Sequence, residues 1–596
     1  MYGWTGKLLR VNLTENTTTS EDISKNVLEN YLGGRGLGTK IIFDEINPKV
    51  NPLSSENKLV FAVGPLSKTK VPTSGRMSLS TKSPLTGTIF DSNAGGFWGA
   101  VLKGAGYDAV VIEGQSETPV RLVIEEENSK IKDASKLWGK GIKFTDKNLN
   151  EEEEGSYQNL MIGPAGENQV KFASISVNGK RSLGRGGVGA VMGAKKLKAI
   201  SVSGNKKVEI ADKEQFDFVN YELKKWIKAN PLTSEAMPKF GTSMLVNLVN
   251  EAGALPTRNF TETQFEMAEN ISGEMLTDKI LQKNSGCYNC PIRCERRTKT
   301  KNEEGHGPEY ETVGLMGSNL GVGDIEAVAE FNYLCNDLGL DTITTGGTLS
   351  CFMEMAEKGI VEYDISFGEA DKIKNLIEKI ALREGIGEEL ARGPREFAHS
   401  YDAGEFAMEV KGLVLPAYDP RGLKGRGLGY ITSNRGACHL RGNMLGPELL
   451  GVPKMIDRFQ PKGKSGLLIN QQNFVAIIDS LVLCQFLTFA VGEEFIARVL
   501  SAVTGVEKTQ QDLLDMGERI WNIERIFNLN AGFRREDDRL PQRFLKETGS
   551  GPASNQVFEQ EVMLDEYYRS RGWNNQGVPT EEKLKDLGLE GIDIDV

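Results

Sequence analysis

Histidine is scarce in this chain, with only His306, His399 and His439 among 596 residues. Cysteine is also sparse: seven residues occur without a regular pairing pattern, which argues against an extracellular disulfide framework. No run of about 18 apolar residues is present, and the N-terminus has no apolar run of signal-peptide length. These absences predict a cytoplasmic protein with no membrane partner.

The charge balance is acidic, with a formal net charge of −11. Nucleic acid is therefore not expected as a partner, because phosphate binding needs a positive surface. One segment reverses the balance, with five basic residues close together: Arg293, Arg296, Arg297, Lys299 and Lys301. This segment is either a solvated surface loop or a docking patch for an acidic electron carrier.

The length predicts two to four domains. Residues 1–208 are rich in short β-branched or alternating runs separated by Gly, Pro and Asn turns, at 7–13, 58–64, 76–82, 108–114, 120–126, 171–177 and 198–204. Helical periodicity dominates after residue 209. We therefore expect a multidomain α+β protein in which an N-terminal β domain precedes mainly helical domains.

Several helices can be placed from periodicity and capping signals. Residues 214–228 are expected to be helical with one apolar face made of Phe216, Val219, Leu223, Trp226 and Ile227. Asp324 is a suitable N-cap for a helix that Gly339 ends. A further buried helix should pass through Phe474, Ile477, Ile478 and Leu481. Residues 423–442 contain much glycine and are expected to form a functional loop region.

Four cysteines have the spacing of one iron–sulfur site. Cys287, Cys290 and Cys294 form a C-x2-C-x3-C run, and Cys484 lies far downstream. Three close thiolates and a distant fourth suit the corners of a [4Fe–4S] cube. Zinc is the alternative, but zinc sites usually have a second close ligand pair, and none follows here. Cys335, Cys351 and Cys438 are interpreted as small apolar filler residues.

A glycine-rich segment, Gly184-Arg-Gly186-Gly-Val-Gly189, matches G-x-G-x-x-G and has an acidic residue, Glu209, about 20 residues later. Dinucleotide binding is one interpretation. The segment comes late in a β-rich region instead of opening a βαβ series, which favours another phosphate-bearing cofactor.

Two short motifs contain candidate proton-transfer groups. Glu309 and Glu311 lie just after the cysteine run, where a carboxylate near a redox centre could transfer protons. His439, in Cys-His-Leu-Arg-Gly, is favoured as a site residue, whereas His306 and His399 are expected at the surface.

Over nearly its whole length the chain resembles the tungsten-containing aldehyde:ferredoxin oxidoreductase family. The shared motifs include, in order, LGGRGLG, TSGRMSLSTKSPLTG, SNAGGFWG, GRGGVGAVMGAKKLKAI, the C-x2-C-x3-C run, GPEYET, DLGLDTIT, LPAYDPRG, CHLRG, D-x3-L-C and RREDDRLP. The resemblance implies a β domain of two sheets over residues 1–208, which holds the cofactor. Two mainly helical domains, 209–410 and 411–596, should cover it.

The resemblance also implies the cofactors: tungsten held by two pyranopterins, a nearby [4Fe–4S] cluster and a magnesium ion bridging the pterin phosphates. The residues expected at the phosphates and magnesium are Arg76, Asn93, Gly95, Arg181, Ser182 and Gly184. Leu340, Asp341 and Asp479 match motifs that hold the pterin rings, while Asn336 replaces the leading Asp of the first motif. Glu330 matches a glutamate that binds a subunit-bridging iron in some relatives, but no histidine follows it before His399, so that iron is not expected.

The activity that the resemblance implies is the interconversion of aldehydes and carboxylic acids, with electrons leaving through the cluster. Glu311 is the candidate for activating water or the nucleophilic oxygen, with Glu309 as the fallback. His439 would hydrogen-bond the substrate carbonyl oxygen or a metal-bound oxygen, and Tyr418 would assist. The electron acceptor would be ferredoxin or dedicated electron-transfer subunits, including a flavin subunit, in a homodimer or hetero-oligomer.

Two alternatives of other classes stay open at this point. A bis-pterin molybdenum reductase usually has its cysteine run near the N-terminus, unlike the run at 287–294. An electron-transfer subunit of a larger complex usually holds several clusters in a short chain, and only one cluster fits here.

Overall fold

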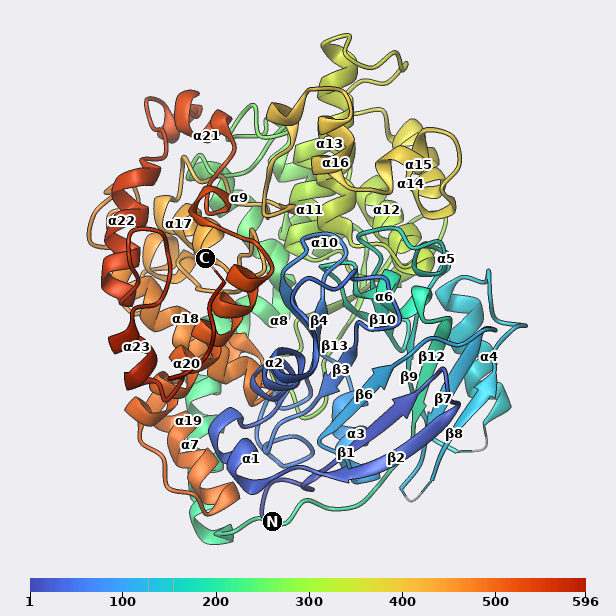
Figure 1. Ribbon diagram of the computed structural model, residues 1–596. Coiled ribbons are helices and arrows are strands. Elements are labelled where there is room, and N and C mark those ends of the chain that lie inside the picture. The colour runs from blue at the N-terminus through green and yellow to red at the C-terminus, as the bar shows by residue number, and fades with distance from the viewer. Residues whose placement is uncertain (127, 154, 596) are drawn as a thin grey trace.

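The computed structural model describes residues 1–126, 128–153 and 155–595. Two six-stranded mixed sheets form its N-terminal part, and helices cover them (Figure 1). The first sheet has the order β2-β1-β6-β3-β4-β5. Its strands are β1 Lys7–Asn12, β2 Thr17–Asp22, β3 Leu59–Ala62, β4 Met77–Lys82, β5 Ile89–Ala94 and β6 Ala109–Glu113.

The second sheet has the order β11-β10-β9-β12-β7-β8. Its strands are β7 Val120–Ile124, β8 Ser129–Asp133, β9 Gln158–Met161, β10 Ile175–Val177, β11 Arg181–Leu183 and β12 Leu197–Val202. The helices of this part are α1 Lys25–Tyr31, α2 Gly34–Glu45, α3 Trp98–Ala105, α4 Ile142–Glu152, α5 Pro164–Glu167 and α6 Val188–Ala194. The predicted two-sheet β domain is confirmed.

The central strands of the first sheet are buried on both faces, and the alternation of their side chains shows how. In β3, Leu59 and Phe61 belong to the core between the two sheets, while Val60 and Ala62 belong to a second core with helices. This is the period of two that a strand imposes. The helices on that second face include α2, α18 and α19, so the sheet lies in the middle of the molecule.

The rest of the chain is mainly helical. The helices before residue 410 are α7 Lys213–Ala229, α8 Met237–Phe240, α9 Leu245–Glu251, α10 Gly273–Lys279, α11 Tyr310–Met316, α12 Ile325–Leu338, α13 Thr342–Glu357, α14 Ala370–Leu382, α15 Ile386–Leu390 and α16 Pro394–His399. Those after it are α17 Lys424–Thr432, α18 Ser465–Ser480, α19 Glu493–Thr504, α20 Gln510–Asn530, α21 Gln542–Lys546, α22 Gln560–Arg571 and α23 Glu581–Asp586. Short strands interrupt them: β13 Leu281–Ser285, β14 Glu295–Lys299, β15 Glu304–His306, β16 Glu409–Val410 and β17 Leu413–Val414. The division of the helical part at residue 410 stays a prediction.

The helices foreseen from the sequence are present. The side chain of Asp324 caps α12 by accepting a hydrogen bond from the Glu326 amide, and Gly339 ends that helix in the left-handed conformation. Phe474, Ile477 and Ile478 lie buried in α18. In α7, Phe216, Val219, Leu223 and Ile227 are buried as expected.

Two sequence-based expectations about helices were wrong. Trp226 is 50% exposed, because it lies at the border of the buried face of α7, where its ring pairs with the partly buried Phe495 at the edge of that core. Residues 424–432 form the buried helix α17 instead of a loop. Its glycines permit close packing, since a Cβ atom on Gly427 would lie 2.6 Å from the Phe558 ring. Only the following residues, 433–442, are irregular.

Among the residues that the structure describes, no helix combines the length and apolar character needed to cross a membrane.

Candidate active site

A cavity of about 420 Å³ lies where the sheets meet both helical segments. The cysteine run and the candidate catalytic residues were predicted from distant parts of the sequence, and the structure brings them together here. The predicted residues that line the cavity are Arg76, Asn93, Gly95, Arg181, Ser182, Gly184, Cys287, Cys290, Cys294, Glu311, Asp341, Tyr418, His439, Asp479 and Cys484. Leu340 is the exception: its side chain is buried in the hydrophobic core and does not reach the cavity.

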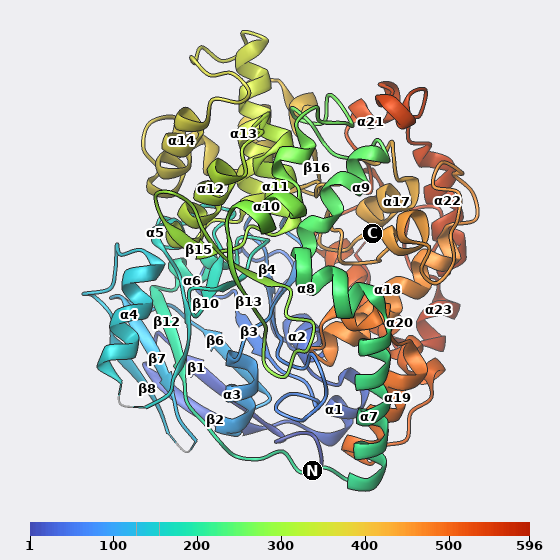
Figure 2. The ribbon, with the colours of Figure 1, turned by 180° about the vertical axis from the view of Figure 1, so that it is seen from behind.

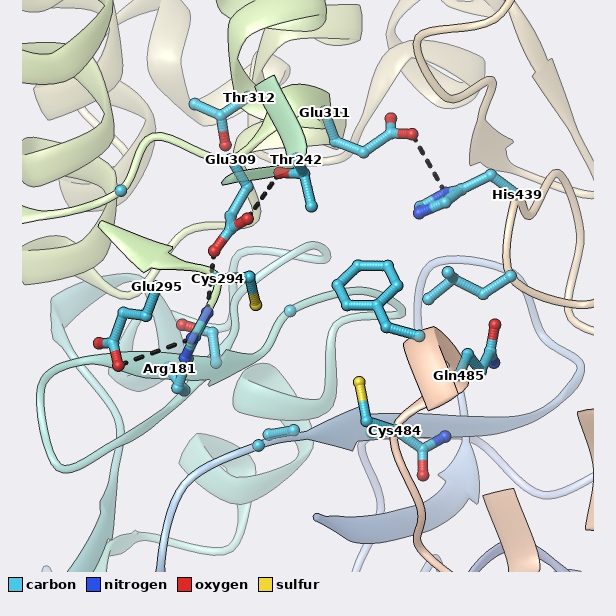
Figure 3. A pocket seen from close by; sticks show the side chains of 18 of the residues that line it. Arg181, Thr242, Cys294, Glu295, Glu309, Glu311, Thr312, His439, Cys484 and Gln485 are labelled. Carbon is cyan, nitrogen blue, oxygen red and sulfur yellow. Dashed lines mark hydrogen bonds and ion pairs between the residues drawn. The ribbon is translucent and has the colours of Figure 1, made fainter. Parts of the chain in front are cut away.

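Thr73 of the β domain forms a backbone hydrogen bond with each of the two cysteine segments. The carbonyl of Thr73 accepts a hydrogen bond from the Cys484 amide (3.2 Å), and the Thr73 amide donates to the carbonyl of Asn289, between Cys287 and Cys290 (3.0 Å). None of the cysteines forms a disulfide. Figure 3 shows the thiols of Cys294 and Cys484 directed into the same space.

The chemistry of the four thiols fits a metal cluster. Burial and neighbouring cysteine sulfurs raise the pKa of Cys290 to about 11, and burial also raises the pKa of Cys294 and Cys484. Thiolates in such a place need a compensating positive charge, which iron supplies. No group of three or more His, Cys, Asp or Glu side chains in the described residues is close enough to hold a single metal ion, which disfavours the zinc alternative.

Glu311 and His439 face each other across another part of the cavity (Figure 3). Glu311 lies in the first turn of α11, and its Oε2 accepts a hydrogen bond from the Ala417 amide (2.9 Å). Its Oε1 lies 3.4 Å from Nδ1 of His439. Burial raises the pKa of Glu311 to about 7, while burial and nearby guanidinium groups hold the pKa of His439 well below its usual range. The pair therefore combines a neutral imidazole with a carboxyl group that titrates near neutrality.

Tyr418 lies beside this pair in a buried aromatic group. Its ring centroid is 5.0 Å from that of Tyr310 and 6.2 Å from that of His439, and the guanidinium of Arg426 lies 4.9 Å from its ring. Burial raises the pKa of Tyr418 well above its ordinary value, so its hydroxyl stays protonated. Tyr418 can donate a hydrogen bond but cannot act as a base at neutral pH.

The fallback residue Glu309 is less free than Glu311. One carboxylate oxygen forms an ion pair with Arg181 (2.8 Å), and the other accepts a hydrogen bond from the Thr242 hydroxyl (2.6 Å). Arg181 also lies 3.6 Å from Glu295 (Figure 3). These contacts indicate that Glu309 holds Arg181 in place. Glu311 is better suited to proton transfer than Glu309, because its Oε1 accepts no hydrogen bond from the described residues.

Four buried arginines lie in the cavity wall: Arg185, which the sequence already indicated as a phosphate-binding residue beside the glycine-rich segment, and Arg426, Arg435 and Arg441, which sequence reasoning missed. Seven basic and five acidic side chains line the cavity in the part of the chain that the structure describes. The Nε atoms of all four of these arginines, and of Arg181, are buried without a hydrogen-bond partner. A net positive wall with unused donors fits an anionic, phosphate-bearing cofactor. No sequence spacing indicates this, because the arginines converge only through the fold.

Cys438 was interpreted as an apolar filler residue, and this was wrong. Its Sγ accepts hydrogen bonds from Nη2 of Arg435 (2.8 Å) and from the Leu440 amide (3.3 Å). The guanidiniums of Arg435, Arg441 and Arg185 lower the pKa of the Cys438 thiol although burial opposes this. The thiol is thus a polar partner within the arginine group.

The glycine-rich segment at 184–189 does not belong to a dinucleotide-binding βαβ unit. It connects β11, the second strand of the antiparallel β10–β11 hairpin, to α6, and β12 then runs antiparallel to its neighbour β9. Part of its glycine content serves packing. A Cβ atom on Gly187 would lie 2.0 Å from the carbonyl oxygen of Lys171, and one on Gly189 would lie 2.4 Å from that of Ser174. The topology therefore contradicts the dinucleotide interpretation.

The basic segment after the cysteines is only partly a surface. Arg296 is buried, and its guanidinium donates to the carbonyls of Met237, Pro238 and Lys239, because β14 packs against α8. His306, expected at the surface, lines the cavity and lies 2.9 Å from Glu295, whereas His399 is exposed as predicted. The carboxylate of Glu330 is held by Thr300, Asn302 and Lys374.

Comparison with protein families decides which group this chain belongs to. A model described as "Aldehyde ferredoxin oxidoreductase, N-terminal domain" matches residues 8–204, and one described as "Aldehyde ferredoxin oxidoreductase, domains 2 & 3" matches residues 219–589. The chain belongs to the aldehyde ferredoxin oxidoreductase family. The resemblance inferred from the sequence is confirmed, and the chain is an oxidoreductase of this family.

Individual relatives agree with this membership. The chain is 46% identical to the tungsten-containing aldehyde ferredoxin oxidoreductase of Pyrococcus abyssi, over 99% of this chain and 100% of that protein. It is 45% identical to the enzyme of the same name from Thermococcus kodakarensis, over 99% of each. A solved structure, the active site complex BamBC of benzoyl coenzyme A reductase, contains a chain with the same fold. That chain has a TM-score of 0.85 and 26% identity, with 99% of this chain and 97% of that chain covered.

Proposed function

We propose that this protein interconverts aldehydes and carboxylic acids and exchanges electrons with ferredoxin or a dedicated iron–sulfur subunit. The observation that carries the proposal is one cavity that joins four convergent thiols to the Glu311–His439 pair. Family membership implies a tungstopterin, and the positive cavity wall suits its phosphates. When bound, the tungstopterin would take up the two electrons of the aldehyde, which the cluster would release singly.

The residues proposed to hold the cofactors follow from their places in the cavity wall. Cys287, Cys290, Cys294 and Cys484 would bind the [4Fe–4S] cluster. Arg76, Asn93, Gly95, Arg181, Ser182 and Gly184 would contact the pterin phosphates and their magnesium, and Asp341 and Asp479 the pterin rings. The unpartnered Oδ1 of Asn93 and Nε of Arg181 support such contacts. The buried side chain of Leu340 does not support one.

The reaction releases two protons for each aldehyde oxidised by water, because RCHO + H₂O gives RCOOH + 2 e⁻ + 2 H⁺. Glu311 would accept one of them at Oε1, the carboxylate oxygen that no hydrogen bond occupies. His439 is neutral and has a single N–H, so its Nε2 would donate to the substrate carbonyl oxygen when Glu311 is protonated and donates to Nδ1; when Glu311 is ionised, that N–H lies on Nδ1 and faces the carboxylate. Tyr418, held protonated, would donate a second hydrogen bond.

Metal analysis combined with a dye-linked assay tests the proposal. We expect tungsten and about four irons per chain, together with oxidation of aliphatic or aromatic aldehydes that reduces a viologen dye. Molybdenum in place of tungsten would favour the reductase alternative. Iron without tungsten, and no aldehyde-dependent dye reduction, would favour an electron-transfer subunit and refute the proposed activity.

A further inference from the structure

The exposed side of α7 carries three aromatic side chains. Phe218, Tyr221 and Trp226 are 55%, 58% and 50% exposed, while the opposite side of the helix is buried. Trp226 pairs with the ring of Phe495 in α19, with centroids 6.2 Å apart. Several large aromatic groups kept in solvent on one helix are characteristic of a protein interaction surface.

The charge around Trp226, toward the C-terminal end of α7, is opposite to that of the whole chain, whereas the N-terminal turns of α7 also expose Asp212, Glu214 and Asp217 near Phe218. The exposed charged residues between positions 224 and 240 are Lys224, Lys225, Lys228, Glu235 and Lys239. In the cysteine-bearing hairpin, from Leu281 to Lys299, every exposed charged residue is basic: Lys283, Arg293, Arg297 and Lys299. No described carboxylate lies within ion-pair distance of Lys224, Lys225 or Lys228. A protein of net charge −11 thus has a local basic surface here.

This surface is continuous with the segments that carry the cysteines. The Asn230 side chain, one residue beyond α7, donates to the carbonyl of Phe489 in the short helix Gln485–Phe489, which directly follows Cys484. Arg296 of the hairpin donates to the carbonyl of Lys239 (2.9 Å). Figure 2 shows α7, α8 and the hairpin strand β13 on the same side of the molecule. We call this area, from α7 through α8 to the hairpin, the α7–hairpin face.

We propose that the α7–hairpin face is the docking surface for a small, acidic iron–sulfur electron carrier. The proposal rests on the proposed function, since it gives electrons from the cysteine site a partner. Charge complementarity would speed the encounter and orient the carrier, and the exposed aromatics would supply apolar contact. Electron-transfer complexes bury less than about 1,200 Å², so a surface of this kind suffices for a short-lived contact.

Charge reversal on α7 tests the proposal with the holoenzyme. The double variant Lys224→Glu/Lys228→Glu changes the face, and Trp226→Ser removes its central aromatic group. The matched control is Lys358→Glu/Lys546→Glu, which changes the net charge equally at two exposed lysines outside this face. The probe is a purified acidic ferredoxin with two [4Fe–4S] clusters, and the kinetic parameters are compared with those for a viologen dye.

We expect kcat/KM for ferredoxin to fall about 10-fold or more in the α7 double variant and to lose its salt dependence, in line with the usual effect of rim charges on association. Dye-linked activity should not fall, and the control should match the unmodified enzyme in both assays. Equal ferredoxin kinetics in variant and control would overturn the proposal. So would charge-dependent binding of the face to anionic phospholipid vesicles without any change in ferredoxin kinetics. If the unmodified enzyme does not reduce the dye with aldehydes, that result would instead refute the proposed function.

Discussion

Oε1 of Glu311 lies 3.4 Å from Nδ1 of His439, although the two residues come from α11 and from the loop after α17. Burial makes the carboxylate of Glu311 less favourable, and four arginines around His439 disfavour its imidazolium form. Both residues therefore prefer their neutral forms more than they would in water. Glu311 can therefore take up or release a proton near neutral pH, while His439 stays neutral.

Glu311→Gln tests the role of the carboxylate. The substitution keeps the shape of the side chain but removes its ability to accept a proton, so we expect kcat to fall about 10²-fold or more. Tungsten and iron contents should not change. Glu309→Gln is the matched comparison, because Glu309 is already engaged by Arg181 and Thr242. A larger loss in Glu309→Gln than in Glu311→Gln would transfer the role to Glu309.

The pH dependence of aldehyde oxidation should report the same group. If Glu311 accepts a proton, the active form is the carboxylate, and its pKa is raised from the usual value to about 7. kcat/KM should thus rise with pH through about 7 and level off above it. The measurement is a pH profile of dye-linked activity in the unmodified enzyme and in the Glu311→Gln variant. If kcat/KM of the Glu311→Gln variant still falls below the same pH, the group that titrates there is not Glu311.

Cys484→Ala should remove the cluster or convert the [4Fe–4S] form, since the fourth iron would lose its protein ligand. The measurements are iron content and the EPR spectrum of the reduced protein. Cys351→Ala is the control, because Cys351 is fully buried in α13, where its thiol donates a hydrogen bond to Sδ of Met355 (3.8 Å), and it does not line the cavity. An unchanged [4Fe–4S] signal in Cys484→Ala would disprove the ligand assignment.

The purified chain should reduce viologen with aldehydes and show no activity with NAD alone, because the segment at 184–189 follows an antiparallel hairpin and not the first strand of a βαβ unit. The assay is NADH formation followed by absorbance. NAD reduction by this chain without an added protein would revive the dinucleotide interpretation. Activity that appears only with a separate flavin subunit would leave the present assignment intact.

Gly193→Ala should destabilise the protein, since the new Cβ atom would lie 1.8 Å from the Gly166 carbonyl oxygen. Overpacking of this kind costs about 1–3 kcal/mol of unfolding free energy. Gly466→Ala is the matched control in α18, where an added Cβ atom meets nothing within 4 Å. Thermal unfolding should show a lower Tm for Gly193→Ala and no loss for Gly466→Ala. Equal Tm values would mean that α6 shifts without cost.

The sequence predicted the apolar strands but not the polar ones. All seven predicted strand runs coincide with strands, from β1 to β12. The five strands missed among β1 to β12 include β2, whose sequence TTTSED has no apolar residue and is largely exposed. Such a strand forms because its backbone hydrogen-bonds to the edge of β1. The local pattern of apolar and polar residues contains no information about that edge.

The candidate site was predictable where a motif contains the chemistry, as in the cysteine run and CHLRG. It was not predictable where convergence creates the chemistry. Arg185 and Arg441 are about 250 residues apart in the chain, and the sequence around Arg441 does not distinguish it from a surface arginine. Only burial beside Asp341 and Asp479 makes them part of a positive wall.

The position of Cys484 at the end of α18 has a consequence for biosynthesis. At a translation rate of about 5–20 residues per second, Cys484 is made roughly 10 to 40 seconds after Cys294. In that interval a nascent chain displays three thiols whose fourth partner does not yet exist, and the wall formed by Arg435, His439 and Asp479 is equally absent. A cluster of four thiolates can therefore be completed only after release or near the end of synthesis, which makes cofactor loading a late maturation step.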